Sequence, residues 1–121
     1  MDDLTGIAEN RYRITLYKNN NEAGYIQLVF YYDNITLPHI EYELKPEYRG
    51  LGIMSEQLPK YIEFCKSLNY KALIALVKGD NIASRKLLLK NKFAKITSKI
   101  ADVDTYILIL KFNMGLKNEN I

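Results

Sequence analysis

The stretch that decides the fold of this chain is residues 42–57, Tyr-Glu-Leu-Lys-Pro-Glu-Tyr-Arg-Gly-Leu-Gly-Ile-Met-Ser-Glu-Gln. Apolar and polar residues alternate up to Leu44, Pro46 ends that strand, and an amphipathic helix opens after Gly52. Glycines at a strand-to-helix turn let the backbone approach a ligand closely, and a helix N-terminus adds free N–H donors with partial positive charge. The stretch therefore predicts an anion cradle, and a pyrophosphate is the anion we expect there.

Three strands are expected before and up to this turn. Alternating β-forming and polar residues place them at 11–18, 24–32 and 39–45. In the first, Tyr12, Ile14 and Leu16 should share one face. The short links at 19–22 and 33–38 predict an antiparallel meander, and residues 1–10 read as a short arm.

The helix after Gly52 carries an apolar stripe with helical spacing. Its members are Leu58, Tyr61, Ile62, Cys65 and Leu68. Pro59 should bend the helix or unsettle its first turns, and Asn69-Tyr70 should end it. The unbroken apolar run 72–77 predicts a central strand covered on both faces, and it should run parallel to strand 39–45 because a helix joins the two.

The remainder of the chain adds a helix and two strands. We expect a turn at 78–81, a helix over 82–92, and strands at 94–100 and 104–112 joined at 101–103, with 106–110 fully buried. The order β-β-β-α-β-α-β-β predicts a mixed α/β domain, with about six strands in one central sheet. The domain should span residues 1–113, with 114–121 as a flexible C-terminal tail.

Composition excludes several classes of protein. The 121 residues fit one domain, and a net charge of +3 without dense basic clusters argues against nucleic-acid binding. Nothing approaches the roughly 20 apolar residues of a membrane span, so no membrane partner is expected. The single Cys65 rules out an internal disulfide and, with an acidic N-terminus unlike a signal peptide, predicts a cytoplasmic location.

Two glycine motifs fit the turn poorly. The Lys-Ser/Thr ending of a P-loop is absent. A dinucleotide-binding fold would start with the βαβ unit, whereas here three meander strands come first. The turn Arg49-Gly50-Leu51-Gly52-Ile53-Met54 instead resembles the pyrophosphate loop of the GNAT N-acetyltransferase superfamily, Gln/Arg-x-x-Gly-x-Gly/Ala, except at its last position. A second motif of its RimJ/RimL-type branch, Asn-x-x-Ser-Arg-x-x-Leu-x-Lys-x-Gly-Phe, is matched by Asn81, Ser84, Arg85, Leu88, Lys90 and Phe93, with Lys92 replacing the glycine.

The resemblance implies a GNAT fold and a direct transfer from acetyl-CoA to a primary amine such as a protein N-terminus or polyamine, without a metal. It implies that the cofactor is held by Tyr42, Leu44, Lys45, Arg49, Gly50, Leu51, Gly52, Ile53, Met54, Asn81, Ser84 and Arg85. The backbone at 42–45 would pair with the pantetheine arm, and one N–H there would polarise the thioester carbonyl. Asn81 could instead be a helix cap. Arg85, with Lys86 and Lys90, could meet the 3′-phosphate of CoA or form a solvated helix face.

The transfer also needs an acid that protonates the leaving thiolate and a base that deprotonates the amine. Many members use a tyrosine acid where this chain has Leu88, so Ser84 is the expected acid, or else a hydroxyl bonded to the backbone. Glu41 and Glu43 are the candidate bases; either could also be a solvated strand carboxylate, and His39 could act instead. Leu76 replaces a glutamate that some relatives carry.

The acceptor site raises a further question, because only about ten residues precede the first recognisable strand. Full-length relatives begin with a strand and one or two helices that wall the acceptor site. A second subunit could complete that site, so a homodimer is one expectation. The alternatives are a non-catalytic acyl-CoA-binding or regulatory domain of the same fold, and an interaction module that uses the sheet edge.

Overall fold

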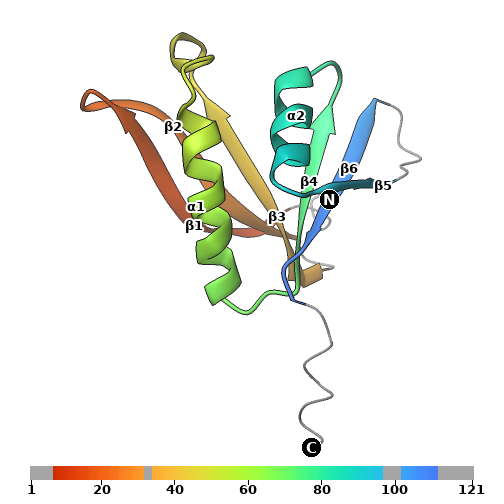
Figure 1. Ribbon diagram of the computed structural model, residues 1–121. Helices are drawn as coiled ribbons and strands as arrows, with labels where there is room; N and C mark the ends of the chain where they lie inside the picture. The colour runs from red at the N-terminus through yellow and green to blue at the C-terminus, as the bar shows by residue number, and fades with distance from the viewer. Residues whose placement is uncertain (1–6, 32–33, 97–101, 112–121) are drawn as a thin grey trace, which may run out of the picture.

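The computed structural model of the chain describes residues 7–31, 34–96 and 102–111 (Figure 1). Its elements are β1 (Ile7–Lys18), β2 (Asn21–Tyr31), β3 (Asn34–Leu44), the 3-10 turn η2 (Pro46–Tyr48), α1 (Ile53–Ser67), β4 (Ala72–Lys78), α2 (Ile82–Lys90), β5 (Ala94–Ile96) and β6 (Val103–Ile109). The strands form a mixed sheet in the order β1-β2-β3-β4-β6-β5. The predicted order of elements is therefore confirmed.

The first hairpin is longer and tighter than predicted. Residues 7–10 belong to β1 rather than to an arm, while residues 1–6 lie outside the described part. The turn needs only Asn19 and Asn20, whose positive φ angles of 52° and 68° suit a two-residue hairpin. Tyr12 also has a positive φ, and the β1–β2 register shifts around it, so the predicted alternation of side chains fails at this bulge.

The strand β3 contains a proline that was expected to lie in a connection. Pro38 is fully buried within β3, and the β2–β3 register is irregular between Val29 and Tyr31, opposite this region. A proline can enter a sheet where the ladder is irregular, because its missing N–H then breaks no regular hydrogen bond. The predicted link 33–38 is therefore wrong, because only residues 32–33 separate β2 from β3, and these lie outside the described part.

Both helices cover the same face of the sheet (Figure 1). The predicted stripe of α1 is buried at Leu58, Tyr61, Ile62 and Cys65, and α1 continues through the exposed Pro59. One hydrophobic core joins this stripe to Leu88 of α2 and to inward-facing residues of β2, β3 and β4. Burial of this shared apolar surface is what holds the two helices at fixed positions on the sheet.

Two strands are less covered than their sequences predict. In β4, Leu76 is 51% exposed, and in β6 only Tyr106 is buried while Ile109 is 44% exposed. The helices cover one face, so part of the opposite face remains open and the prediction of full burial was wrong. Residues 97–101 and 112–121 lie outside the described part, as do the predicted link at 101 and the C-terminal tail.

The site is positioned by the divergence of two neighbouring strands, β3 and β4. The parallel strands β3 and β4 are paired at only one position, His39 with Ile74, whereas β4 pairs with β6 along its whole length. Beyond that point β3 and β4 diverge and form a V, with α1 beginning beside one arm and α2 beside the other (Figure 1). Within the described ranges, no helix is long and apolar enough to cross a bilayer.

Candidate functional site

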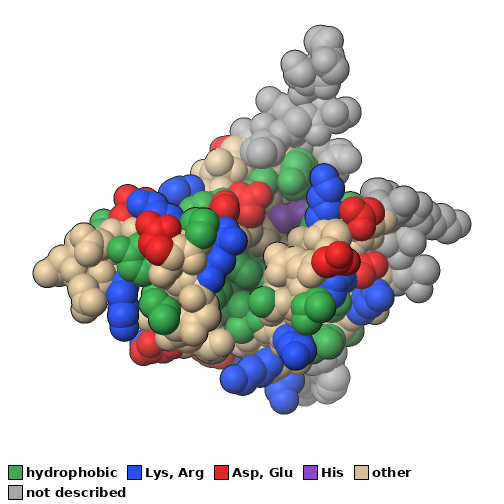
Figure 2. Space-filling view, turned by 90° about the horizontal axis from the view of Figure 1, so that it is seen from above, with side chains coloured by type: hydrophobic (Ala, Val, Ile, Leu, Met, Phe, Trp, Pro, Cys, Tyr) green, Lys and Arg blue, Asp and Glu red, His purple; other side chains and the backbone are tan. Residues whose placement is uncertain are grey.

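A cavity of about 590 Å³ occupies the V between β3 and β4. It is lined by Tyr42, Glu43, Leu44, Arg49, Gly50, Gly52, Ile53, Met54, Ser55, Asn81, Ala83, Ser84 and Leu87. Figure 2 looks onto the open end and shows hydrophobic side chains in the hollow between the two arms, with lysines and arginines around its rim. The cavity therefore combines an apolar floor with polar groups at its mouth, as ligand sites commonly do.

One wall of the cavity is the glycine turn, and it presents backbone rather than side chains. Gly50 and Gly52 have φ angles of 75° and 84°, a conformation that residues with a Cβ adopt reluctantly. Gly52 caps α1, and the first backbone bond of the helix runs from the Glu56 N–H to the Gly52 carbonyl at 3.1 Å. The N–H groups of 53–55 therefore have no acceptor within the helix. They make the start of α1 a place for an anion, as the sequence predicts.

The inner edge of β3 forms the next part of that wall. The Lys45 N–H donates to the Ala23 carbonyl of β2 at 2.8 Å, so this amide faces away from the cavity. Backbone groups alternate in direction along a strand, so those of Tyr42 and Leu44 face the V, where β4 has already turned away. The Lys45 N–H is thus engaged with β2, and cofactor binding by Lys45 stays a prediction. The backbone groups of Tyr42 and the N–H of Leu44 remain open toward the V, where an extended ligand could pair with them.

The Arg49 side chain braces the turn. Its Nε donates to the Leu44 carbonyl at 2.9 Å, and its Nη2 lies 3.9 Å from Glu43 Oε2, an exposed pair of little energetic weight. The guanidinium thus links the turn to the end of β3. It lies at the mouth of the cavity but is committed to the protein's own backbone.

The opposite wall comes from α2 and presents side chains. Asn81 Oδ1 accepts a hydrogen bond from the Ser84 N–H at 3.0 Å, so the helix-cap reading of Asn81 is confirmed while the residue also lines the cavity. The Ser84 hydroxyl lies 2.7 Å from the Tyr42 hydroxyl of β3. The expected alternative, a Ser84 hydroxyl bonded to backbone, is therefore not what the structure shows. Burial raises the pKa of Tyr42, and its hydrogen bond with Ser84 partly offsets this rise.

Arg85 lies outside the residues that line the cavity. Its guanidinium pairs with Asp104 of β6 and donates to the Gly79 carbonyl, and Lys95 Nζ lies 3.5 Å from the same aspartate. Hydrogen bonding to Tyr106 and then to Asp104 raises the pKa of Arg85, which keeps it charged. The structure thus places the Arg85 guanidinium in the link between α2 and β6, and contact between Arg85 and the cofactor stays a prediction.

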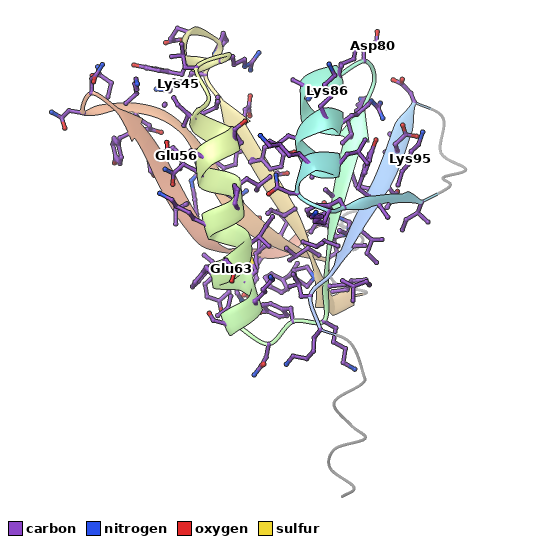
Figure 3. All side chains as sticks on the ribbon, viewed as in Figure 1. Lys45, Glu56, Glu63, Asp80, Lys86 and Lys95 are labelled. Atoms are coloured by element: carbon purple, nitrogen blue, oxygen red, sulfur yellow. The ribbon has the colours of Figure 1, made fainter. Side chains whose placement is uncertain are left out.

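Other basic groups remain at the mouth. Lys45 and Lys86 lie on opposite sides of the open end of the V (Figure 3), and both are exposed. Their charges attract an anion without fixing its position, because lysine side chains are long and flexible.

The candidate bases are split between two places. Glu43 lines the cavity, but Glu41 does not: its Oε1 accepts from Gln27 Nε2 at 2.7 Å, and Gln27 Oε1 accepts from Arg13 at 3.3 Å. Because Tyr42 points toward α2, its neighbours along the strand point to the opposite face of the sheet. His39 lies at the vertex of the V, with its ring against Tyr31 at 4.8 Å between centroids. The structure brings neither glutamate into contact with Ser84.

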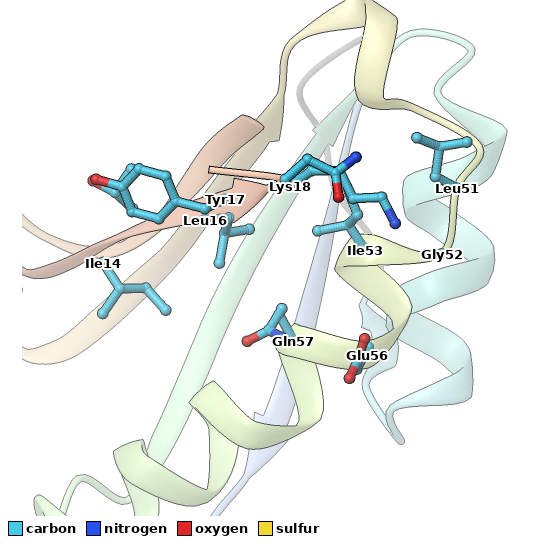
Figure 4. Close-up of a pocket in the computed structure, with 11 residues that line it drawn as sticks. Ile14, Leu16, Tyr17, Lys18, Leu51, Gly52, Ile53, Glu56 and Gln57 are labelled. Atoms are coloured by element: carbon cyan, nitrogen blue, oxygen red, sulfur yellow. The ribbon is translucent and has the colours of Figure 1, made fainter. Parts of the chain in front are cut away.

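Leu51 belongs to a second cavity of about 390 Å³, on the other side of the glycine turn (Figure 4). This cavity lies between the end of β1 and the first turn of α1, and shares Gly52 and Ile53 with the first. The Leu51 side chain is 55% exposed there, so only its backbone remains available to the first cavity.

Sequence reasoning missed three lining residues, namely Ser55, Ala83 and Leu87. The spacing of 83, 84 and 87 on α2 could have found two of them, because positions three and four apart share a helix face. It also missed the Tyr42 side chain, since the phenol meets Ser84 only after the chain has folded.

Comparison with known proteins identifies the family. The model of the acetyltransferase (GNAT) domain matches residues 4–94. This chain belongs to the GNAT acetyltransferase family. Its six-stranded mixed sheet with two helices is the GNAT fold that the two motifs predicted. No curated protein sequence matches this GNAT chain closely enough to count as a relative.

Solved structures agree with the GNAT assignment at the level of fold. RimL, a ribosomal-protein alpha-N-acetyltransferase solved with coenzyme A, superposes with a TM-score of 0.68 at 22% identity over 80% of this chain and 60% of RimL. An N-acetyltransferase from Staphylococcus aureus Mu50 gives 0.71 at 22% identity, over 82% and 67% of the two chains. The N-acetyltransferase PseH of Campylobacter jejuni, solved with acetyl coenzyme A, gives 0.66 at 21%, over 86% and 70%. The chain thus spans about three-fifths of RimL.

Proposed function

We propose that this GNAT chain is an acetyl-CoA-dependent N-acetyltransferase that transfers the acetyl group directly to a primary amine. The acceptor class we propose is a protein N-terminus, a polyamine or another small amine; the neighbour RimL is named for a protein N-terminus and the neighbour SpeG for spermidine. The observation that carries the proposal is the V between β3 and β4, whose cavity joins the glycine turn to the start of α2.

The residues of the cavity suit each part of acetyl-CoA. The backbone N–H groups from Gly50 to Met54 would hold the pyrophosphate, because they combine close approach with the positive end of α1. The backbone groups of Tyr42 and the N–H of Leu44, which face the V, would pair with the pantetheine arm as an added strand does. Lys86 would attract the 3′-phosphate, a role that the sequence predicts for the group Arg85, Lys86 and Lys90, and Lys45 would do so from the opposite side of the mouth.

Two tasks remain for the protein at the reacting end. A β3 amide facing the V would donate to the thioester carbonyl oxygen, and such a donor stabilises the transition state by about 3 kcal/mol. A base must take a proton from the incoming amine. We assign this task to Glu43, acting through water, because its backbone lines the cavity and its carboxylate lies 3.9 Å from Arg49 at the cavity mouth, although the side chain points to the opposite face of the sheet. Glu41 is the second candidate because it lies on the same strand.

A second function is a non-catalytic acyl-CoA-binding domain of the same fold. The burial of Leu88 favours it, because this position carries the usual tyrosine acid, yet here it is fully buried in the core. Leu76, at the position of a glutamate in some relatives, is likewise apolar and half exposed. Both substitutions remove groups that could move a proton.

Binding and turnover are tested separately. Isothermal calorimetry with CoA and acetyl-CoA should give a saturable heat, and both ligands should raise the melting temperature, whereas inorganic phosphate should do neither. Thiol release from acetyl-CoA is then followed with peptides, polyamines and small amines as acceptors. Binding with turnover on one class supports the enzyme, and binding without turnover on any class supports the second function. Absence of heat at millimolar CoA would overturn both.

The partner and the compartment also follow as proposals. We also propose that the chain forms a homodimer, in which a second copy lies beside the acceptor site. Sedimentation velocity with and without CoA measures whether the chain dimerises. A cytoplasmic location remains a prediction that fluorescence microscopy of the tagged chain would check.

A further inference from the structure

Two hydroxyl groups meet across the V. The Tyr42 side chain of β3 reaches over the cavity, and its oxygen lies 2.7 Å from Ser84 Oγ of α2. Both residues line the cavity, and both side chains are partly buried. This distance is typical of an O–H···O hydrogen bond, and either oxygen can be its donor. The bond connects the β3 wall of the cavity to the first turn of α2.

We propose that Tyr42 is the acid of the transfer reaction: its phenol supplies the proton that the leaving sulfur takes up, and Ser84 passes that proton on. The inference rests on the proposed function. It gives the Tyr42 side chain a role, whereas the family motif points only to the Ser84 hydroxyl.

The atoms of this step balance. The amine nitrogen forms a bond to the acetyl carbon, the carbon–sulfur bond breaks, and its electron pair stays on sulfur. Ser84 gives its hydroxyl proton to the sulfur and receives the proton of Tyr42 in the same movement. Glu43 takes the proton that the amine loses, and that proton then returns through water to the phenolate of Tyr42. The products are the acetylated amine and CoA with a neutral thiol.

Chemistry favours the phenol as the source of the proton. A thiol titrates near pH 8.5 and a tyrosine near pH 10, whereas an aliphatic hydroxyl does not titrate in the range proteins experience. Efficient proton transfer needs an acid whose strength is close to that of the group it serves. Ser84 acting alone would end as an alkoxide, which is far more basic than a thiolate. Backed by Tyr42, Ser84 ends as a neutral hydroxyl.

The surroundings keep Tyr42 in its acid form. Burial raises the pKa of the phenol, so it stays protonated through neutral pH, while the hydrogen bond from Ser84 would stabilise the phenolate once it forms. The usual acid position on α2 is Leu88, which is fully buried and carries no proton. The other hydroxyl that lines this cavity belongs to Ser55, in the first turn of α1. The phenol of Tyr42 therefore supplies from β3 what α2 lacks.

The kinetic test compares Tyr42→Phe, Ser84→Ala and the double variant with a control, Tyr70→Phe. Tyr70 lies in the α1–β4 connection and is absent from the residues that line the cavity. Tyr42→Phe should lower kcat about 100-fold with KM for acetyl-CoA changed less than twofold. The high-pH decline of kcat should disappear with the phenol. The double variant should be no slower than Tyr42→Phe, because the two groups act as one unit. Tyr70→Phe should match wild type.

A purely structural bond would give a different pattern. If Tyr42 only holds the walls together, Tyr42→Phe would lower the melting temperature and raise KM, and the pH profile of kcat would keep its shape. Wild-type kcat in Tyr42→Phe would equally overturn the proposal.

A binding measurement decides the matter even when no amine is turned over. Calorimetry compares CoA with S-methyl-CoA at pH 7 and at pH 10, where the free thiol is ionised. Tyr42→Phe should lose about tenfold in affinity for CoA at pH 10 only, and nothing for S-methyl-CoA. Equal losses for both ligands, or no loss, would overturn the role of Tyr42 while leaving cofactor binding intact. Absence of CoA binding to wild type would instead remove the proposed function and this inference together.

Discussion

The two walls of the V are built in different ways. The wall from β3 through the glycine turn to α1 offers backbone groups, and its geometry is fixed by glycines at Gly24, Gly50 and Gly52. The wall from α2 offers side chains, chiefly Asn81 and Ser84, held by the cap of the helix and by a link from Arg85 to β6. The backbone wall therefore suits recognition of a diphosphate, whereas the side-chain wall suits proton transfer at the thioester end of acetyl-CoA.

The two walls should tolerate different substitutions. A backbone site survives most side-chain substitutions but not the loss of a glycine that sets its conformation. A side-chain site keeps its shape under mild substitution and loses function when one polar group goes. Breaking each wall in its own way should therefore give separable effects on stability and affinity.

The largest effect is expected where the first wall meets β2. A Cβ on Gly24 would lie 2.1 Å from the Glu43 carbonyl oxygen, a backbone atom that cannot rotate away. Gly24→Ala should therefore cost about 3 kcal/mol of unfolding free energy, measured by urea denaturation. Gly79→Ala is the control, because its nearest contact would be 3.8 Å and only its positive φ is strained, at about 1 kcal/mol. Equal losses in the two variants would show that β2 and β3 can separate freely.

Alkaline pH should lower the free energy of unfolding, because α1 of the first wall carries a buried thiol. Burial raises the pKa of Cys65 to about 12 from a reference of 9.0, so the folded protein binds this proton more tightly than the unfolded chain does. Stability is unaffected below about pH 9 and should fall by up to about 1.4 kcal/mol per pH unit between pH 9 and 12. Burial also raises the pKa of Tyr61, which adds to the fall at the upper end.

The measurement is urea denaturation from pH 8 to 10.5 for wild type and Cys65→Ala. The variant starts lower because it leaves a cavity, but its curve should be flatter from pH 9 upward. Parallel curves would mean that the thiol of Cys65 is not what makes α1 sensitive to base.

The next effect concerns affinity. Gly52→Ala should weaken CoA binding about tenfold, because alanine is strained by about 1–2 kcal/mol at the φ of 84° that points the α1 amides at the ligand. Gly79→Ala carries a similar strain outside the cavity and should leave the Kd unchanged. Calorimetry with CoA measures both. If Gly52→Ala bound CoA as wild type does, the backbone wall would not be what holds the diphosphate.

The smallest effect is expected at the ion pair between Arg85 and Asp104, which links α2 to β6. Asp104→Asn removes the charge that Arg85 and Lys95 share on β6, so α2 should be slightly less stable while the Kd for CoA stays within twofold. Lys86→Ala is the contrasting variant: it should weaken CoA modestly, and more at low salt, without a change in stability. A larger loss of affinity in Asp104→Asn than in Lys86→Ala would mean that Arg85 contacts the ligand after all.

The order of strands and helices, the buried stripe of α1 and the glycine turn could be predicted from the sequence, because they depend on local periodicity and on backbone freedom at Gly50 and Gly52. It could not determine the bulge at Tyr12, the close approach at Gly24 or the partly open face around Leu76, because each depends on which strand or helix packs alongside. Tertiary structure alone turned Arg85 toward Asp104 and brought the hydroxyls of Tyr42 and Ser84, 42 positions apart, within hydrogen-bond distance. The sequence shows the chemistry that each side chain offers. Which distant residue that side chain contacts depends on the packing of the strands and helices, including the divergence of β3 from β4.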